Sequence, residues 1–296
     1  MRAVVNLIRP AQWLKNFFLF APLIFSKHLF ELSYVATAGQ AFVVFSLLSS
    51  TVYVLNDLAD READKLHPTK RNRPIATGII SVTQGILIAV TLLVLVILCS
   101  LMLPGKFMIV GGVYLLLNLA YSFSLKKVFL LDVFLVASGF MLRVLAGAFA
   151  IDVEVSHWLI LCTLFISLFL AISKRRGELL LVKNSEEYAG RPVLREYEVE
   201  FIDQIMTIVA AGMAISYALY TVADRTVIMF GTENLIFTTV FVLFGIFRYL
   251  HLMRKKKTDD NPTHLLSTDP VTLVNITAYC IVCVLIIYGD IIKGWF

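Results

Sequence analysis

The residues best placed to do chemistry lie at 56–64, where a long apolar stretch gives way to a polar one. Asp57, Asp60 and Asp64 are spaced by three and then four residues, so on a helix they share one face about one turn apart. Asn56 lies four residues before Asp60 and can flank that face. Carboxylates this close repel one another unless a cation neutralises them. Mg²⁺ takes one or two carboxylates and completes its shell with water and substrate phosphates. The pattern therefore predicts that the three aspartates bind Mg²⁺ together with a phosphate-bearing substrate.

A purely structural interpretation is open for the same segment, because Arg61, Lys65 and Arg71 could pair with the acids of a solvated helix end. Ionisable groups at the end of a membrane span are costly and usually functional, which favours the metal. Downstream, Lys70 and Arg73 suit the remaining charge of a pyrophosphate. Their alternative role is the ordinary positive charge of a cytoplasmic loop.

The elements that position these residues are apolar. Of the 296 residues, 59% are hydrophobic and 16% are charged, whereas soluble domains carry about a quarter charged residues. The apolar residues form runs of about 20, the length that crosses a bilayer as a helix. We predict one integral membrane domain over residues 1–296, all-α, with nine transmembrane helices. The predicted spans are 14–34, 37–57, 80–103, 106–123, 129–150, 157–173, 204–224, 233–253 and 271–291.

The basic residues predict the topology. With the N-terminus in the cytoplasm, the inside segments hold most of the 26 lysines and arginines, as the positive-inside rule requires. Those segments are 1–15, 58–79, 124–128, 174–203 and 254–270. The basic residues behind the net charge of +5 are thus predicted to line one membrane face, which argues against a nucleic-acid partner. We expect a multi-pass protein of the bacterial inner membrane with its active site on the cytoplasmic side.

The acidic segment resembles the first aspartate-rich motif of the UbiA superfamily of intramembrane prenyltransferases. The matching residues are Asn56, Asp57, Asp60 and Asp64, followed by Lys70, Asn72, Arg73 and Pro74. The resemblance covers essentially the whole chain. It implies nine helices around a central cavity, Mg²⁺-dependent ionisation of a diphosphate, and transfer of the resulting carbocation.

One part of the chain departs from the superfamily pattern. Members typically carry a second aspartate-rich motif after the sixth span, where this chain has Lys174, Arg175 and Arg176 followed by Glu178. A second acidic face would bring in more Mg²⁺ for a prenyl diphosphate, whereas cations bind additional phosphate directly. The departure favours a donor other than a prenyl diphosphate.

Further details resemble the decaprenyl-phosphate phosphoribosyltransferase branch of the superfamily. The matching residues are Arg9, Pro10, Gln12, Trp13, Lys15, Asn16, Tyr121, Ser122, Leu125, Lys126, Asp132, Gly139, Phe140, Arg143, Gly147, Lys174, Arg175 and Glu178. The resemblance implies phosphoribosyl pyrophosphate as donor and a long polyprenyl phosphate as acceptor. These substrates bring three anionic centres, which one acidic Mg²⁺ face and several cations suit better than two acidic faces do. The predicted substrate-binding residues are Asn56, Lys15, Lys70, Arg73, Tyr121, Lys126, Arg143, Lys174, Arg175 and Glu178.

For some of these residues, more than one role is consistent with the sequence. We expect Lys126, Lys174 and Arg175 to contact phosphate. Arg143 lies inside the fifth predicted span, where an unpaired charge is costly, so it either faces the cavity or pairs with Asp132.

Three more residues have open roles. Glu178 either contacts substrate or orients Lys174, four residues earlier on the helix. Tyr121 either hydrogen-bonds a phosphate or is an interface aromatic residue. Lys15 either reaches the mouth of the cavity or anchors the chain at the interface.

Other functions compete with this prediction. The first is a conventional prenyltransferase, which would move a prenyl group from a prenyl diphosphate to an aromatic or other acceptor and would need a second acidic set. A transporter is disfavoured because the charges gather at one membrane face and no pair of broken helices is evident. A scaffold gives no reason for three stacked aspartates. The sequence does not determine the chain length of the acceptor. It also does not determine the oligomeric state, and a homo-oligomer is possible.

Overall fold

The computed structural model describes residues 2–66, 70–184, 192–255 and 268–293. The predicted cytoplasmic segments 58–79, 174–203 and 254–270 therefore lie in part outside the described residues. The chain divides into two compact units, Met1–Val155 (unit 1) and Ser156–Phe296 (unit 2). All regular structure in the described residues is helical, which confirms the predicted all-α class.

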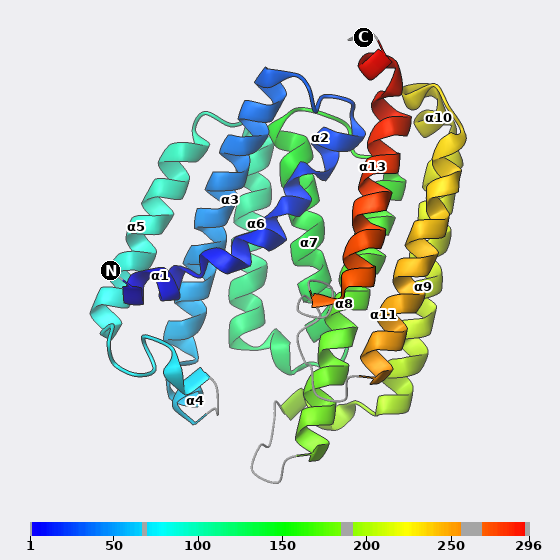
Figure 1. Ribbon diagram of the computed structural model, residues 1–296. Helices are drawn as coiled ribbons and strands as arrows, with labels where there is room; N and C mark the ends of the chain where they lie inside the picture. The colour runs from blue at the N-terminus through cyan, green and yellow to red at the C-terminus, as the bar shows by residue number, and fades with distance from the viewer. Residues whose placement is uncertain (1, 67–69, 185–191, 256–267, 294–296) are drawn as a thin grey trace. The chain divides into compact units, whose positions relative to one another are not determined.

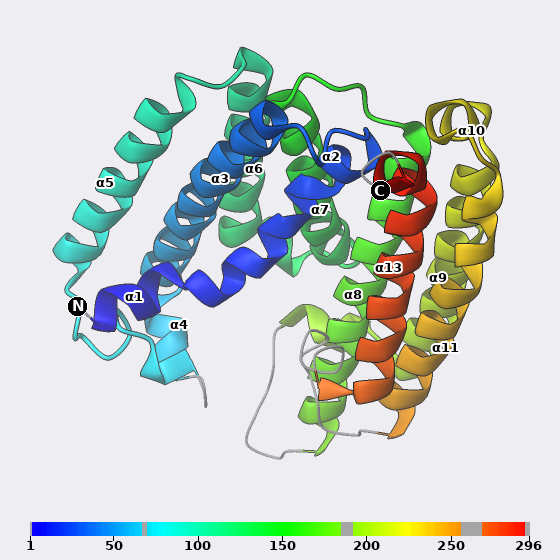
Figure 2. The same ribbon diagram turned by 45° about the horizontal axis from the view of Figure 1, so that its top comes forward.

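The helices of unit 1 (Figure 1) are α1 Arg2–Ile8, the 3₁₀ helix η1 Pro10–Phe20, α2 Ala21–Phe25, α3 Leu32–Ala59, α4 Arg61–Lys65, η2 Lys70–Asn72, α5 Val82–Ser100, α6 Gly105–Phe123, η3 Leu125–Lys127 and α7 Leu131–Ala150. Those of unit 2 are α8 His157–Asn184, η4 Pro192–Glu196, α9 Val199–Val222, α10 Asp224–Phe230, η5 Asn234–Thr238, α11 Thr239–Lys255 and α13 Pro270–Lys293. Within unit 2, the long helices α8, α9, α11 and α13 run side by side (Figure 2).

Eight of these helices are long and apolar enough to cross a membrane, so the chain is a multi-pass membrane protein. The candidate spans are Leu32–Ala59, Val82–Ser100, Gly105–Phe123, Leu131–Ala150, His157–Val182, Val199–Val222, Asn234–Lys255 and Pro270–Gly289. The predicted span 14–34 is the one that takes a different form in the described chain. It consists of most of η1, then α2 and a turn in which Lys27 has a φ of 63°. Proline stands in the first turn of both helices, at Pro10 and Pro22, where it favours a fresh helix start over continuation.

The 3₁₀ geometry of η1 explains which of its side chains face the rest of unit 1. Residues three apart eclipse one another in a 3₁₀ helix, so Trp13, Asn16 and Leu19 lie along one edge. Trp13 donates to Ser50 Oγ at 3.0 Å, Asn16 donates to Ser46 Oγ at 3.0 Å, and Leu19 is buried in the core. In Figure 1, α1 and η1 cross obliquely over α3, α6 and α7.

The core of unit 1 surrounds α3. A cluster of buried side chains there includes Phe45 and Leu48 of α3, Tyr114 of α6 and Ala146 of α7. At the next residue of α7, a Cβ at Gly147 would lie 1.9 Å from the carbonyl oxygen of Leu19, so only glycine lets α7 approach η1 this closely. Small residues at helix contacts are the usual device for close packing in membranes. The closeness of η1 to α3 and α7 fixes the segment that follows Arg9.

Candidate active site

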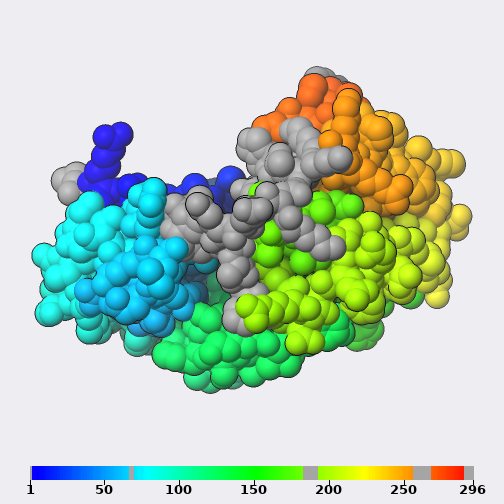
Figure 3. Space-filling model, turned by 90° about the horizontal axis from the view of Figure 1, so that it is seen from below, coloured from blue at the N-terminus to red at the C-terminus, as the bar shows by residue number. Residues whose placement is uncertain are grey.

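The acidic segment lies at the end of α3 nearest α4. Figure 3 shows the molecule from below, with α4 in light blue. Helix α3 ends at Ala59, and Asp60, with φ −92° and ψ 6°, separates it from α4. The backbone bonds Asp60 N to Asn56 O (2.9 Å) and Asp64 N to Asp60 O (2.8 Å) carry the helical path across this break. The three aspartates therefore keep close to their helical spacing, as predicted.

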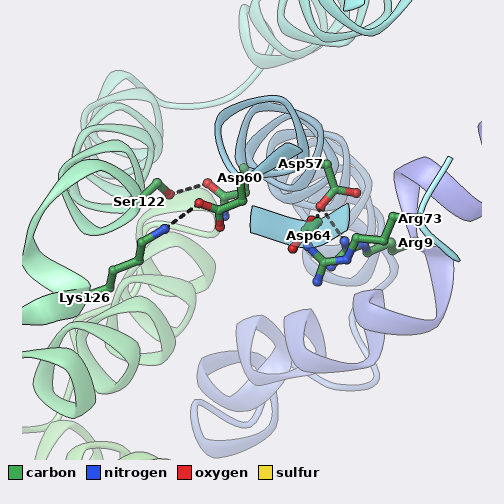
Figure 4. Close-up of polar contacts among 8 residues, drawn as sticks. Arg9, Asp57, Asp60, Asp64, Arg73, Ser122 and Lys126 are labelled. Atoms are coloured by element: carbon green, nitrogen blue, oxygen red, sulfur yellow. Dashed lines mark hydrogen bonds and ion pairs between the residues drawn. The ribbon is translucent and has the colours of Figure 1, made fainter. Parts of the chain in front are cut away.

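Two of the three aspartates are buried and joined by arginines. The side chains of Asp57 and Asp64 are 2% and 4% exposed. Arg73 places one nitrogen, NH1, at 3.0 Å from Asp57 Oδ1 and at 2.7 Å from Asp64 Oδ2. Arg9 donates from NH2 to the same Asp57 oxygen at 2.6 Å. Both guanidinium groups thus converge on the Asp57–Asp64 pair from one side (Figure 4).

The third aspartate turns to a different partner. Asp60 accepts a hydrogen bond from Lys126 Nζ at 2.6 Å, and its side chain is 33% exposed. Beside it, Ser122 of α6 donates to Asn56 Oδ1. Asp60 therefore faces Lys126 of η3, whereas Asp57 and Asp64 face Arg9 and Arg73 (Figure 4). The bond with Ser122 places Asn56 against α6. The shared helix face predicted from spacing is divided into a pair and a single carboxylate by the cations on either side.

The donor set can be compared with the needs of Mg²⁺. In the described part of the chain, no group of three or more His, Cys, Asp or Glu side chains lies close enough to hold an ion by itself. Mg²⁺ needs only one or two protein carboxylates, because waters and substrate phosphates complete its shell. Asp57 and Asp64 share an arginine nitrogen, and Asp57 Oδ2 is a buried oxygen without a hydrogen-bond partner. These two carboxylates fit an ion that arrives with phosphate ligands.

Arg143, predicted to face substrate or to pair with Asp132, lies in a buried network and is 5% exposed. Its three nitrogens donate to Asn16 Oδ1 (2.7 Å), to the Gly139 carbonyl (2.7 Å) and to Tyr114 OH (3.0 Å). The guanidinium also lies 5.0 Å from the centre of the Tyr114 ring. Its partners are thus polar and aromatic groups of η1, α6 and α7 rather than Asp132. Arg143 thus ties Asn16 of η1 to the core of unit 1.

The remaining predicted residues of unit 1 lie in elements near the acidic segment. Lys70 is in η2, and its carbonyl accepts from Arg73 N at 2.9 Å. Tyr121 is next to Ser122 near the end of α6, and Lys15 is in η1; both are partly exposed.

In unit 2, the basic cluster lies in the last part of α8. Lys174 is exposed, whereas Arg175 is 4% exposed and donates from NH1 to Glu178 Oε2 at 2.5 Å. Glu178 thus bonds the cation three residues before it, and its predicted roles, substrate contact or orientation of Lys174, stay predictions. Arg176 donates to Asp203 of α9 at 2.7 Å. Sequence reasoning missed this last pair, because a partner 27 residues away on another helix leaves no local pattern.

Arg9 is the main site residue that sequence reasoning did not assign. It was noted only as part of a motif, and its partner Asp57 lies 48 residues later. The available signal was its place immediately before the first apolar run, at the predicted cytoplasmic face, where a cation can reach an acidic helix end.

Residues 17–267 match the profile of the UbiA prenyltransferase family. The chain belongs to this family. Over 221 residues it is 38% identical to the decaprenyl-phosphate phosphoribosyltransferase of Mycolicibacterium smegmatis, covering 73% of this chain and 69% of that one. The identity to the enzyme of the same name from Mycobacterium tuberculosis is also 38%, with 73% of each chain covered.

A solved structure of a UbiA homologue from Archaeoglobus fulgidus, bound to DMAPP and Mg²⁺, has the same fold, with a TM-score of 0.69, 20% identity and 99% of both chains covered. The protein is therefore a membrane-embedded enzyme with the UbiA fold.

Proposed function

We propose that this UbiA-family enzyme transfers 5-phosphoribose from phosphoribosyl pyrophosphate to a polyprenyl phosphate of the decaprenyl type and releases pyrophosphate, with Mg²⁺ as cofactor. The names of its 38%-identical relatives support this assignment. One observation carries it on physical grounds: a buried carboxylate pair already bonded to two guanidinium groups. Such a site has both the acceptors for a metal ion and the donors for the diphosphate that accompanies it.

In this proposal, Asp57 and Asp64 would hold the ion, with Asn56 and Asp60 beside them. The bound ion would neutralise charge on the leaving pyrophosphate and fix its position. Arg73 lies within reach of the diphosphate oxygens, because it contacts both buried carboxylates at 3.0 Å and 2.7 Å.

Other cations serve the remaining anionic groups. Lys126, bonded to Asp60, is partly exposed and can bind a phosphate of the donor, as can Lys70. For unit 2 we propose Lys174, Arg175 and Glu178 as substrate-binding residues, with Glu178 bonded to the Arg175 guanidinium. We retain Lys15 and Tyr121 as substrate contacts. Arg143 then acts through Asn16 and η1.

The bond changes need little acid–base chemistry. The bond between the ribose anomeric carbon and the pyrophosphate oxygen breaks, and pyrophosphate leaves with the electron pair. An oxygen of the lipid phosphate forms the new bond from the opposite face. This nucleophile is already anionic, so no proton has to be removed, and positioning and electrostatics carry most of the rate enhancement. We propose that the reaction takes place at the cytoplasmic side of the bacterial inner membrane, the side on which the positive-inside rule predicts the basic segments.

The test compares two labelled donors with the purified enzyme in lipid nanodiscs containing decaprenyl phosphate and Mg²⁺. We expect label from phosphoribosyl pyrophosphate in the extracted lipid, and a fall of about 100-fold or more in Asp64→Asn, since a positioned charged ligand is lost. Glu62→Gln is the matched control, because Glu62 lies on the same short helix with its side chain 74% exposed. Transfer from geranyl diphosphate alone, to an aromatic acceptor added to the same assay, would establish the conventional prenyltransferase instead. Full activity of Asp64→Asn would exclude the proposed site.

A further inference from the structure

Arg9 and Arg73 neutralise the carboxylates that would hold the metal. The two guanidinium groups and the two buried carboxylates cancel in formal charge, and three ion-pair distances of 2.6, 3.0 and 2.7 Å join them. The arginines are more accessible than the acids, with side chains 25% and 24% exposed against 2% and 4%. A divalent ion that entered this pair alone would meet two positive charges within a few ångströms, in a place where water screens them poorly.

Arg9 has an unusual backbone conformation, and contacts with neighbouring residues fix it. It has φ 53° and ψ 62°, in the left-handed region that costs free energy for any residue other than glycine. Its N–H donates to Val5 O at 3.1 Å, and its carbonyl accepts from Gln12 N at 2.9 Å. The guanidinium also lies 5.4 Å from the centre of the Tyr53 ring. These contacts aim the side chain at Asp57 from the junction of α1 and η1.

The neutralisation by the arginines is incomplete. Both of them bond Asp57 Oδ1, whereas Asp57 Oδ2 is buried and has no hydrogen-bond partner. A buried carboxylate oxygen without a donor is costly, so a group that binds it is expected in the working enzyme. A divalent ion would satisfy this oxygen, provided that the displaced arginines find other anionic partners.

We propose that Arg9 is a diphosphate-binding residue and that, together with Arg73, it acts as an exchangeable counter-ion. In the resting enzyme the two arginines keep free divalent ions off the Asp57–Asp64 pair. When an ion and a diphosphate bind together, the guanidinium groups pass to the diphosphate oxygens and the carboxylates pass to the ion. Metal binding then depends on the diphosphate. The inference rests on the proposed function only in that the ligand is a diphosphate.

The experiment measures Mn²⁺ bound to the purified, intact protein by equilibrium dialysis, with and without inorganic pyrophosphate. Binding at the site is defined as the part lost in Asp64→Asn. The wild type should bind free Mn²⁺ weakly and bind it at least about tenfold more tightly with pyrophosphate. Arg9→Gln should bind free Mn²⁺ about tenfold or more tightly than the wild type does, and should gain less from pyrophosphate. Arg9→Lys keeps the charge and should stay close to the wild type without pyrophosphate, which separates a charge effect from a folding defect.

Arg61→Gln is the matched control, because Arg61 is an exposed cation of α4 whose ion pair is with Glu62 at 3.6 Å. It should bind Mn²⁺ as the wild type does under both conditions. The proposal is overturned if the wild type binds Mn²⁺ equally well with and without pyrophosphate, or if Arg9→Gln weakens the binding of the free ion. Neither outcome depends on which group the enzyme transfers. The donor assay can therefore fail while this inference holds, and this inference can fail while the donor assay succeeds.

Discussion

Gly147 is the point at which α7 touches the backbone of η1, and Gly147→Ala tests how strictly that contact positions the N-terminal segment. The added Cβ would lie 1.9 Å from Leu19 O and 2.8 Å from Leu19 C. Ordinary contact requires the helices to separate by about 1.5 Å, and no side-chain rotation can relieve a clash with backbone atoms. Overpacking of this kind costs about 1–3 kcal/mol, which exceeds the ~1 kcal/mol that alanine gains over glycine in a helix.

Gly112→Ala in α6 is the matched control, because nothing lies within 4 Å of a Cβ built there. Thermal unfolding of both variants in one detergent should show Gly147→Ala melting several degrees below the wild type, and Gly112→Ala at or slightly above it. The Michaelis constant for the donor should rise only in Gly147→Ala, since Arg9 immediately precedes η1. The reasoning is refuted if Gly147→Ala melts at the same temperature as Gly112→Ala.

Two further predictions concern charged contacts. Lys126→Gln removes the ammonium group 2.6 Å from Asp60 and should lower kcat/KM by roughly 10- to 100-fold, as expected for loss of a charge-assisted hydrogen bond. Lys127→Gln is the control, because Lys127 is an exposed neighbour, and it should change kcat/KM little. Equal effects of the two substitutions would exclude a specific role for Lys126. In unit 2, hydrogen bonds from Arg248 and Thr272 hold the pKa of Asp269 well below its usual range. The Arg248–Asp269 pairing therefore stabilises the fold fully above about pH 4, the ordinary pKa of an aspartate. This stabilisation is lost as the pH falls further, towards and through the lowered pKa. Arg248→Gln should therefore unfold at lower temperature than the wild type at pH 7, with a gap that narrows towards pH 3; a gap that stays constant with pH would contradict this assignment.

Much of the fold followed from simple patterns. The long apolar runs gave the all-helical membrane class, because lipid offers no hydrogen-bond partners to the backbone. The spacing of Asp57, Asp60 and Asp64 predicted a continuous helical path, and backbone hydrogen bonds carry that path from the end of α3 across Asp60 into α4. Both features are local, since each depends on residues that are close together in the sequence.

The features that were missed depend on distant contacts. The segment 14–34 is apolar enough to be predicted as a span, but it forms a 3₁₀ helix that begins at Pro10 and a short α-helix with Pro22 in its first turn, and both pack on α3 and α7. Arg9 reaches Asp57 only because η1 is held there. The turning of Asp60 towards Lys126, 66 residues later, could not be read from the spacing of the acids.

The central claim is that Asp57 and Asp64 hold a diphosphate-bound divalent ion. Electron–nuclear double resonance of the enzyme with Mn²⁺ and phosphoribosyl pyrophosphate measures it directly, because phosphorus atoms bonded to a metal-coordinated oxygen give a resolved ³¹P coupling. We predict this coupling in the protein-bound Mn²⁺ of the wild type, and its loss in Asp57→Asn and Asp64→Asn. Bound Mn²⁺ with undiminished ³¹P coupling in both variants would contradict the account.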